Sequence, residues 1–150
     1  MTSKGEFQLT AKADRIDELK DGTLRIIDYK TGAPPSKAEV AAGFSPQLPL
    51  EALIVHAGGF EGISAKSVSD LSYWRLRGGN PAGEILSVGE NPRQLIVEAE
   101  KGVAALIRRF DDESTPYESQ PRPENAPKFS DYEHLARVKE WSTYDRESSS

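Results

Sequence analysis

A turn flanked by two alternating stretches constrains the fold of this chain more than any other feature. Residues 6–19 alternate apolar and polar side chains, beginning with Phe7, and residues 23–31 continue the same period of two. The intervening Lys20-Asp21-Gly22 is a composition typical of hairpin turns. The sequence therefore predicts two adjacent antiparallel strands over 6–19 and 23–31.

Charged side chains gather at the open end of this predicted hairpin. Asp28 and Lys30 are two residues apart, so a strand places both on one face. Asp14 occupies the corresponding point of the preceding strand, and we favour it over Asp17, which lies close to the turn. In isolation Asp28 and Lys30 are more typical of a solvated surface pair. Two carboxylates and a lysine converging at one point instead indicate a metal-dependent phosphodiester hydrolysis site.

The remaining pattern predicts helices and further strands. Ser36 followed by Glu39 is a capping-box pattern that starts a short helix ending near Ala42. Ser45-Pro46 predicts an N-cap with proline at the first helical position. The predicted elements are a helix over 46–57, a strand over 66–77, a weaker strand over 84–88 and a long helix over 91–111 that starts at Asn91-Pro92. We expect an α/β fold with a mixed sheet against which the helices of 46–57 and 91–111 pack.

The start of the helix at 46–57 adds polar side chains to the predicted site. Gln47 is expected to line the site and to bond a metal-bound water or a phosphate oxygen. Glu51, one turn later, shares its face and could support it. Without the two acids, an ordinary polar first turn would be the better interpretation. His56 fits a C-terminal helix position, and His134 lies in a polar tail.

Composition excludes several classes. The chain has 150 residues and no cysteine, so disulfides, zinc ribbons and iron–sulfur clusters are excluded within it. A net charge of −5 argues against a uniformly basic coat for nucleic acid, although a local basic groove stays open. No membrane span or leader segment is visible, and we expect a soluble cytoplasmic protein. We divide the chain into a core over 1–115 and a proline-rich, largely irregular extension over 116–150 with a short helix near 130–140.

The motifs together resemble a known family. Asp-Arg-Ile-Asp at 14–17, Ile-Ile-Asp-Tyr-Lys-Thr-Gly at 26–32 and Gln-Leu-Pro-Leu-Glu-Ala at 47–52 follow one another in the order of the RecB-like branch of the PD-(D/E)XK nucleases. Within that branch the chain is similar to the carboxy-terminal nuclease domains of AddB proteins, which belong to bacterial helicase–nucleases that process double-strand breaks. Tyr-Trp-Arg-Leu at 73–76 and the segment 131–141 extend the resemblance. It implies a restriction-endonuclease-like mixed central sheet flanked by helices.

The resemblance also assigns roles. Asp14 and Asp28 match the family's metal-binding acids, Lys30 the catalytic lysine and Gln47 the glutamine of the following motif, and the backbone carbonyl of Tyr29 is expected to be a further metal ligand. The implied cofactor is Mg²⁺ or Mn²⁺. The implied substrate is DNA, single-stranded or at duplex ends, with an exonuclease-type activity. The implied partner is an AddA-like helicase–nuclease subunit in the bacterial cytoplasm.

Two departures from the family accompany these roles. Many AddB domains bind an iron–sulfur cluster through four cysteines, and this chain has none. The family core also starts with a helix that supplies a His or Glu near the metal, whereas here the first strand is expected almost at Met1. We therefore expect that the chain is a carboxy-terminal fragment. It would be inactive alone if the His or Glu of the missing first helix is essential. The alternatives are a non-catalytic DNA-binding or subunit-docking module, and a metal-dependent nucleotide hydrolase, against which the lack of a glycine-rich phosphate loop argues.

Overall fold

The computed structural model describes residues 5–118 of the chain, which divides into two compact units, Met1–Asp111 and Asp112–Ser150. All the helices and strands described belong to the first unit. In the second unit the described residues form a turn in which Asp112 accepts hydrogen bonds from the backbone and hydroxyl of Ser114, at 2.9 and 2.7 Å. The helix predicted near 130–140 and His134 lie outside the described residues.

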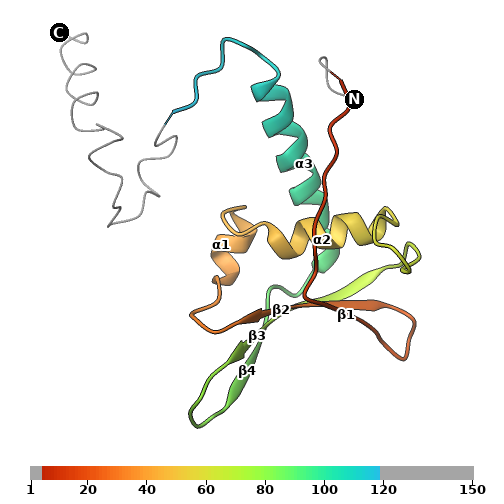
Figure 1. Ribbon diagram of the computed structural model, residues 1–150, viewed down its shortest axis with the longest axis vertical. Coiled ribbons are helices and arrows are strands. Elements are labelled where there is room, and N and C mark those ends of the chain that lie inside the picture. The colour runs from red at the N-terminus through yellow and green to blue at the C-terminus, as the bar shows by residue number, and fades with distance from the viewer. Residues whose placement is uncertain (1–4, 119–150) are drawn as a thin grey trace, which may run out of the picture. The chain divides into compact units, whose positions relative to one another are not determined.

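A four-stranded mixed sheet forms the centre of the first unit (Figure 1). Its strands lie in chain order: β1 (Arg15–Glu18), β2 (Leu24–Lys30), β3 (Val68–Leu76) and β4 (Gly83–Ser87). β1 and β2 are antiparallel, β2 and β3 are parallel, and β3 and β4 are antiparallel. The parallel step requires a long crossover, and the two helices between β2 and β3 provide it.

The predicted hairpin forms, but its first strand is much shorter than expected. The Leu19 amide donates to the Thr23 carbonyl at 2.8 Å, and Gly22 adopts the positive φ of +81° that the turn requires. β1 nevertheless contains only four residues, so the strand predicted over 6–14 is wrong. The backbone N–H of Tyr29 donates to Asp14 Oδ2 at 3.0 Å. In a longer strand pair, this N–H would donate to a backbone carbonyl instead. Period alone cannot distinguish a paired strand from an unpaired extended segment.

Residues 5–118 contain three helices, and two of them begin as predicted. α1 (Lys37–Ala41) carries the complete capping box between Ser36 and Glu39. α3 (Pro92–Phe110) starts with Asn91, whose side chain accepts from the Gln94 amide at 3.2 Å.

α2 (Gln47–His56) begins one residue later than expected, because Pro46 rather than Ser45 is its N-cap. The Leu50 amide donates to the Pro46 carbonyl at 2.9 Å in the first bond of the helix.

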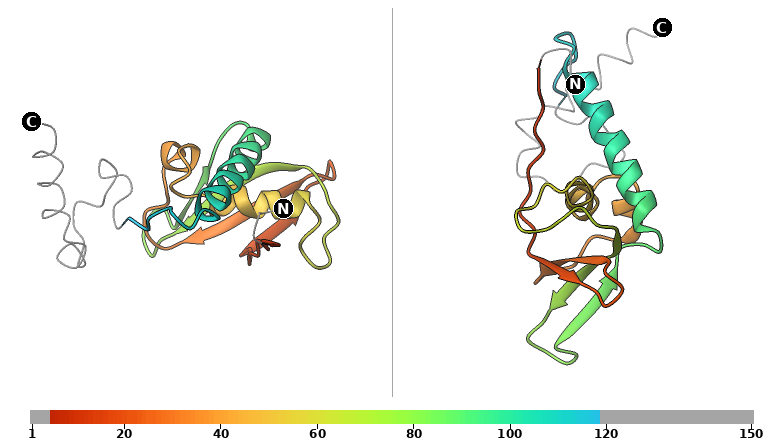
Figure 2. Two further views of the ribbon diagram at one scale, coloured as in Figure 1. Left: turned by 90° about the horizontal axis from the view of Figure 1, so that it is seen from above. Right: turned by 90° about the vertical axis from the view of Figure 1, so that its right-hand side faces the viewer.

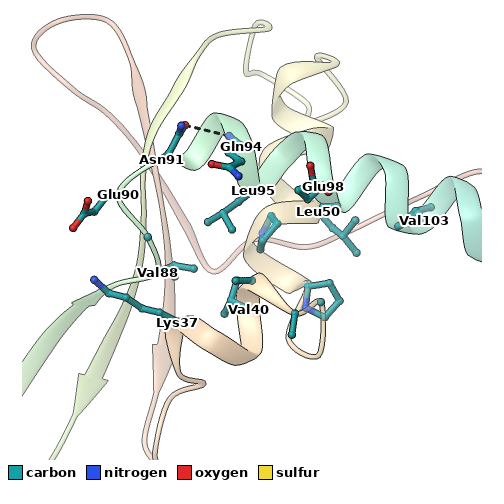
Figure 3. Close-up of a pocket in the computed structure, with 18 of the residues that line it drawn as sticks. Lys37, Val40, Leu50, Val88, Glu90, Asn91, Gln94, Leu95, Glu98 and Val103 are labelled. Carbon is teal, nitrogen blue, oxygen red and sulfur yellow. Dashed lines mark hydrogen bonds between the residues drawn. The ribbon is translucent and has the colours of Figure 1, made fainter. Parts of the chain in front are cut away.

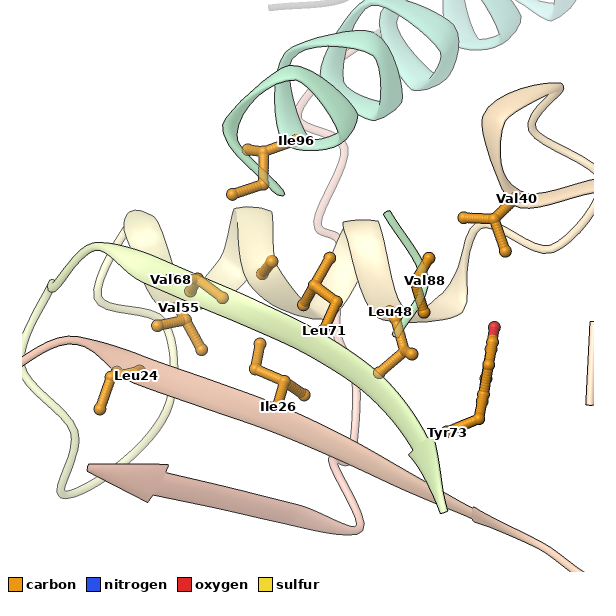
Figure 4. Close-up of a cluster of buried hydrophobic side chains, with 11 residues drawn as sticks. Leu24, Ile26, Val40, Leu48, Val55, Val68, Leu71, Tyr73, Val88 and Ile96 are labelled. Atoms are coloured by element: carbon orange, nitrogen blue, oxygen red, sulfur yellow. The ribbon is translucent and has the colours of Figure 1, made fainter. Parts of the chain in front are cut away.

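The hydrophobic core lies between the sheet and α2. Figures 1 and 2 show α2 and α3 on the same side of the sheet, and α2 contacts β2, β3 and α3. Leu24 and Ile26 of β2 and Leu71 and Tyr73 of β3 face this layer, as Figure 4 shows. The core is completed by Val40, Leu48, Ala52, Val55, Val68, Val88 and Ile96.

On the opposite face of the sheet, Tyr29 and Trp74 form an edge-to-face pair with ring centroids 6.0 Å apart. The Arg15 guanidinium lies 5.4 Å from the Trp74 ring centroid.

The predicted α/β class is confirmed: a mixed sheet is flanked by helices in a restriction-endonuclease-like arrangement. In the part of the chain that the structure describes, no helix is both long enough and apolar enough to cross a membrane.

Candidate active site

Asp28 is the centre of a polar cluster at the end of β2. The alternation of the strand points Leu24, Ile26 and Asp28 toward α2, so the carboxylate follows two core side chains and is only 2% exposed. Such a buried carboxylate requires partners, because removing it from water is costly. Gln47 Nε2 donates to its Oδ1 at 2.8 Å, and Lys30 Nζ lies 2.6 Å from its Oδ2.

Asp14 is bonded to the residue that follows Asp28 in β2. The hairpin pairs Arg15 with Ile27, and Asp14 is the residue just before β1, at the same end of the hairpin as Asp28. The 3.0 Å bond from the Tyr29 amide to Asp14 Oδ2 holds the second carboxylate at the same point, where it is exposed to solvent.

Asp17, the alternative to Asp14, points away from the cluster. Arg15 and Asp17 share the opposite strand face, where Arg15 Nε donates to Asp17 Oδ1 at 2.8 Å. Its position three residues from Asp14 explains this, because an odd separation in a strand reverses the face.

Lys30 is held between a carboxylate and an aromatic ring. Its ammonium contacts Asp28 and lies 5.7 Å from the centroid of the Tyr73 ring, within the range of a cation–π interaction. Asp28 and Tyr73 are partners in the parallel register of β2 and β3, which brings the ring to this position. Lys30 remains 31% exposed, so its ammonium can meet a ligand from solvent.

α2 brings an amide and a third carboxylate to the cluster. Gln47 is the first residue of α2, and Glu51 lies one turn later on the same face. Gln47 Nε2 donates to Glu51 Oε1 at 3.1 Å as well as to Asp28. Glu51 is 2% exposed, and within the described residues its Oε2 has no hydrogen-bond partner.

The surroundings alter the proton affinity of two groups. Burial raises the pKa of Glu51, and the negative charges of Asp28 and Asp14 act in the same direction, while the Gln47 hydrogen bond and Lys30 oppose the shift. Burial also raises the pKa of Tyr73 to about 12, with a further contribution from Asp28. A shifted pKa near several charged groups is characteristic of functional sites.

The chemistry of the cluster fits a hard divalent cation. Asp14 and Asp28 carry carboxylate oxygens, the ligand type that Mg²⁺ and Mn²⁺ prefer, while the Glu51 carboxylate accepts from Gln47. Asp28 Oδ2 lies 2.6 Å from the Lys30 ammonium and has no hydrogen-bond partner among the described residues, so this oxygen retains acceptor capacity. Within residues 5–118 no group of three His, Cys, Asp or Glu side chains lies close enough together to hold a metal ion, so Asp14 and Asp28 are considered as a pair.

The sequence predicted most members of this cluster. Asp14, Asp28, Lys30 and Gln47 come together around the end of β2, and Tyr29 links Asp14 to the strand. His56 lies exposed at the end of α2.

Tyr73 was not anticipated, nor was the deep burial of Glu51. The sequence placed Tyr73 in the predicted strand at 66–77. It did not specify the register that pairs this strand with β2, and that register brings Tyr73 next to Asp28.

A groove of about 800 Å³ lies elsewhere on the first unit, between α1, α2 and α3 (Figure 3). It is mostly apolar, with Val40 and Leu50 on one side and Leu95 and Val103 on the other. Asp14, Asp28, Lys30, Gln47 and Glu51 do not line it. The groove and the polar cluster are therefore separate features.

Comparison with known proteins identifies the family. The sequence model of the PD-(D/E)XK nuclease superfamily matches residues 2–127. An uncharacterized protein of Rickettsia conorii is 38% identical over 63 residues, which cover 42% of this chain and 8% of that protein. An uncharacterized protein of Rickettsia typhi is 46% identical over 64 residues, covering 43% and 7% respectively. One of Rickettsia bellii is 48% identical over 48 residues, covering 32% and 6%.

The matched segments thus span less than a tenth of each of these relatives. No solved structure matches the chain.

Proposed function

The chain belongs to the PD-(D/E)XK nuclease superfamily, and from this membership and the polar cluster we propose that it is a divalent-metal-dependent deoxyribonuclease. The observation that carries the proposal is the buried Asp28 carboxylate, which lies between the Gln47 amide and the Lys30 ammonium, with Asp14 bonded to the adjacent Tyr29 amide. Membership supports nuclease chemistry in general. The choice of metal, DNA and residues is our inference from the site.

In the proposed reaction, water attacks a phosphodiester phosphorus and the bond to the leaving oxygen breaks, which gives a phosphate monoester and a hydroxyl group. Asp14 and Asp28 would hold a divalent cation through carboxylate oxygens. A Mg²⁺ or Mn²⁺ ion held there would supply Lewis acidity toward the scissile phosphate and would make the attacking water more acidic.

The backbone of Tyr29 supports its assignment as a further oxygen ligand. Its N–H points to Asp14 at the β1 edge, and in a strand the carbonyl of the same residue points to the same side.

Lys30 provides the positive charge that the reaction requires. Its ammonium is anchored to Asp28 on one side and is exposed on the other, so it can orient the attacking water or bind the phosphate oxygens on which charge develops. Gln47 orients Asp28 through its amide. These contacts involve phosphate and metal rather than base edges, so cleavage by this site reads no base sequence.

We extend the proposal to the whole protein. The motif order resembles AddB nuclease domains, which supports an exonuclease-type role in double-strand break repair beside an AddA-like subunit in the bacterial cytoplasm. The relatives are far longer than the segments that match this chain. This difference in length supports a nuclease module that forms part of a large protein.

The test is cleavage of end-labelled single-stranded and duplex DNA by this chain and by the longer native protein, with Mg²⁺ and with EDTA. Asp28→Ala should abolish the Mg²⁺-dependent cleavage and leave the fold intact. Asp17→Asn is the matched control, because Asp17 lies on the opposite face of the sheet. Unchanged cleavage by Asp28→Ala would place the active site elsewhere. Cation binding without cleavage in the native protein would favour a non-catalytic DNA-binding or docking module.

A further inference from the structure

Glu51 is an unusual residue for the interior of a small domain. Its side chain is 2% exposed, and the oxygen Oε2 has no hydrogen-bond partner among the described residues. An unpaired buried polar atom costs free energy, and an apolar side chain of similar volume would avoid that cost. The position is therefore poorly explained by stability alone.

The geometry around Gln47 supplies an explanation. A primary amide has two N–H groups in one plane, and Gln47 Nε2 donates one to Asp28 Oδ1 at 2.8 Å and the other to Glu51 Oε1 at 3.1 Å. Gln47 as a whole is exposed, so packing restrains its long side chain little. The two carboxylate acceptors fix both its direction and which end of the amide faces Asp28, because an amide oxygen there would face two anions.

We propose that Glu51 is a positioning residue that holds the Gln47 amide with Nε2 toward Asp28. Gln47 then fixes the plane of the Asp28 carboxylate, with Oδ1 bonded to the amide and Oδ2 left for Lys30 and the cation. This inference rests on the proposed function, in which Asp28 is a cation ligand. Partners of this kind orient the residues that bind a metal, and their loss typically lowers metal affinity by about 10–100-fold.

A plain helix-surface pair does not account for these contacts. Residues four apart on an exposed helix form weak bonds of a few tenths of a kcal/mol, because water competes for both groups. Here the acceptor is buried, and the amide is shared with a residue 19 positions away in another element. The essential property of Glu51 is the acceptor oxygen Oε1 rather than its charge.

Two substitutions separate these properties. Glu51→Gln keeps an acceptor oxygen at the same place and removes the charge. Glu51→Met keeps the volume and removes the acceptor. Both are made in the full chain, and thermal unfolding establishes that each folds; the methionine variant should unfold at the wild-type temperature or above it.

The first readout is hydrogen exchange of the Gln47 side-chain amide, followed by ¹⁵N nuclear magnetic resonance in EDTA. The Gln94 side-chain amide on α3, outside the cluster, is the internal control. In Glu51→Gln we expect the exchange rate of the Gln47 side-chain amide to stay within about threefold of the wild-type rate. In Glu51→Met we expect that rate to rise at least about tenfold, with no change in the rate of the Gln94 side-chain amide.

The second readout is Mg²⁺ affinity by calorimetry, which should fall about 10-fold or more in Glu51→Met and stay within about twofold in Glu51→Gln.

Two results would overturn the proposal. Equal losses in both variants would show that the charge of Glu51 is what the site needs. Wild-type exchange and affinity in Glu51→Met would make Glu51 a space-filling residue. Amide exchange needs neither metal nor DNA, so it tests the role of Glu51 even where the nuclease proposal fails, as unchanged cleavage by Asp28→Ala would show.

Discussion

Replacing Lys30 by Met should destabilise the metal-free protein through the charge that it leaves behind. The substitution removes the ammonium 2.6 Å from Asp28 Oδ2, while the Asp28 side chain stays 3% exposed. Breaking a fully buried ion pair typically costs about 3–5 kcal/mol. Because the Lys30 side chain is 31% exposed, water can partly replace it, and we expect a loss of about 1–3 kcal/mol in the free energy of unfolding.

The assay is a double-mutant cycle of Lys30→Met and Asp28→Asn, measured by thermal or urea unfolding in EDTA. In the Asp28→Asn background the lysine has no carboxylate to neutralise, so its removal should cost little. The coupling energy should be about 1–3 kcal/mol, and for a domain of this size each kcal/mol lowers Tm by roughly 4–8 °C. Saturating Mg²⁺ should restore more stability to Lys30→Met than to wild type, since the cation replaces the missing positive charge.

Equal losses from Lys30→Met in both backgrounds would refute the reasoning. Such additivity would mean that the two side chains, although close, do not interact energetically. The stability loss would then come from the packing of the lysine stem, including its contact with Tyr73.

Four further outcomes are expected. Lys30→Arg should keep Mg²⁺ affinity but lose most single-turnover DNA cleavage, because a planar guanidinium does not reproduce a compact ammonium; wild-type cleavage would reduce Lys30 to an ion-pair partner. Because folding raises the pKa of Glu51 above its ordinary 4.5, wild type should lose stability relative to Glu51→Gln as pH rises from about 4 toward neutrality; parallel unfolding profiles would contradict this. Leu48→Ala, at a fully buried core position, should lower the free energy of unfolding in urea by about 2–5 kcal/mol. A loss of less than about 1 kcal/mol would contradict the packing described. Asn91→Ala should cost about 1 kcal/mol in the same measurement through the lost helix cap, and no change would argue against that bond.

The grouping of Asp14, Asp28, Lys30 and Gln47 at the end of β2 was largely predictable because its signals are local; their role in binding a metal stays a prediction. Asp28 and Lys30 share a strand face, and a turn of recognisable composition brings Asp14 into contact with the backbone of Tyr29 between them. The caps of α1 and α3 were equally readable, since their side-chain bonds join residues three positions apart.

What the sequence did not show depends on distant contacts. Tyr73 reaches Lys30 through the parallel register of β2 and β3, 43 residues further along the chain and fixed by packing. The burial of Glu51 depends on how α2 lies on the sheet, which the position of the residue on the helix does not specify. The segment 6–14 alternates like a strand, but the Asp14 side chain takes the backbone bond that a continued ladder would need.

Divalent-cation binding at Asp14 and Asp28 is the central claim, and calorimetric titration of the full chain with Mg²⁺ tests it most directly. The matched set is wild type, Asp14→Asn, Asp28→Asn and the control Asp17→Asn, whose side chain lies on the opposite strand face. We predict one binding event in wild type and in Asp17→Asn, weakened at least about tenfold in the other two variants because each loses a charged oxygen ligand. Equal affinity in all four proteins, or no binding in wild type, would contradict the account.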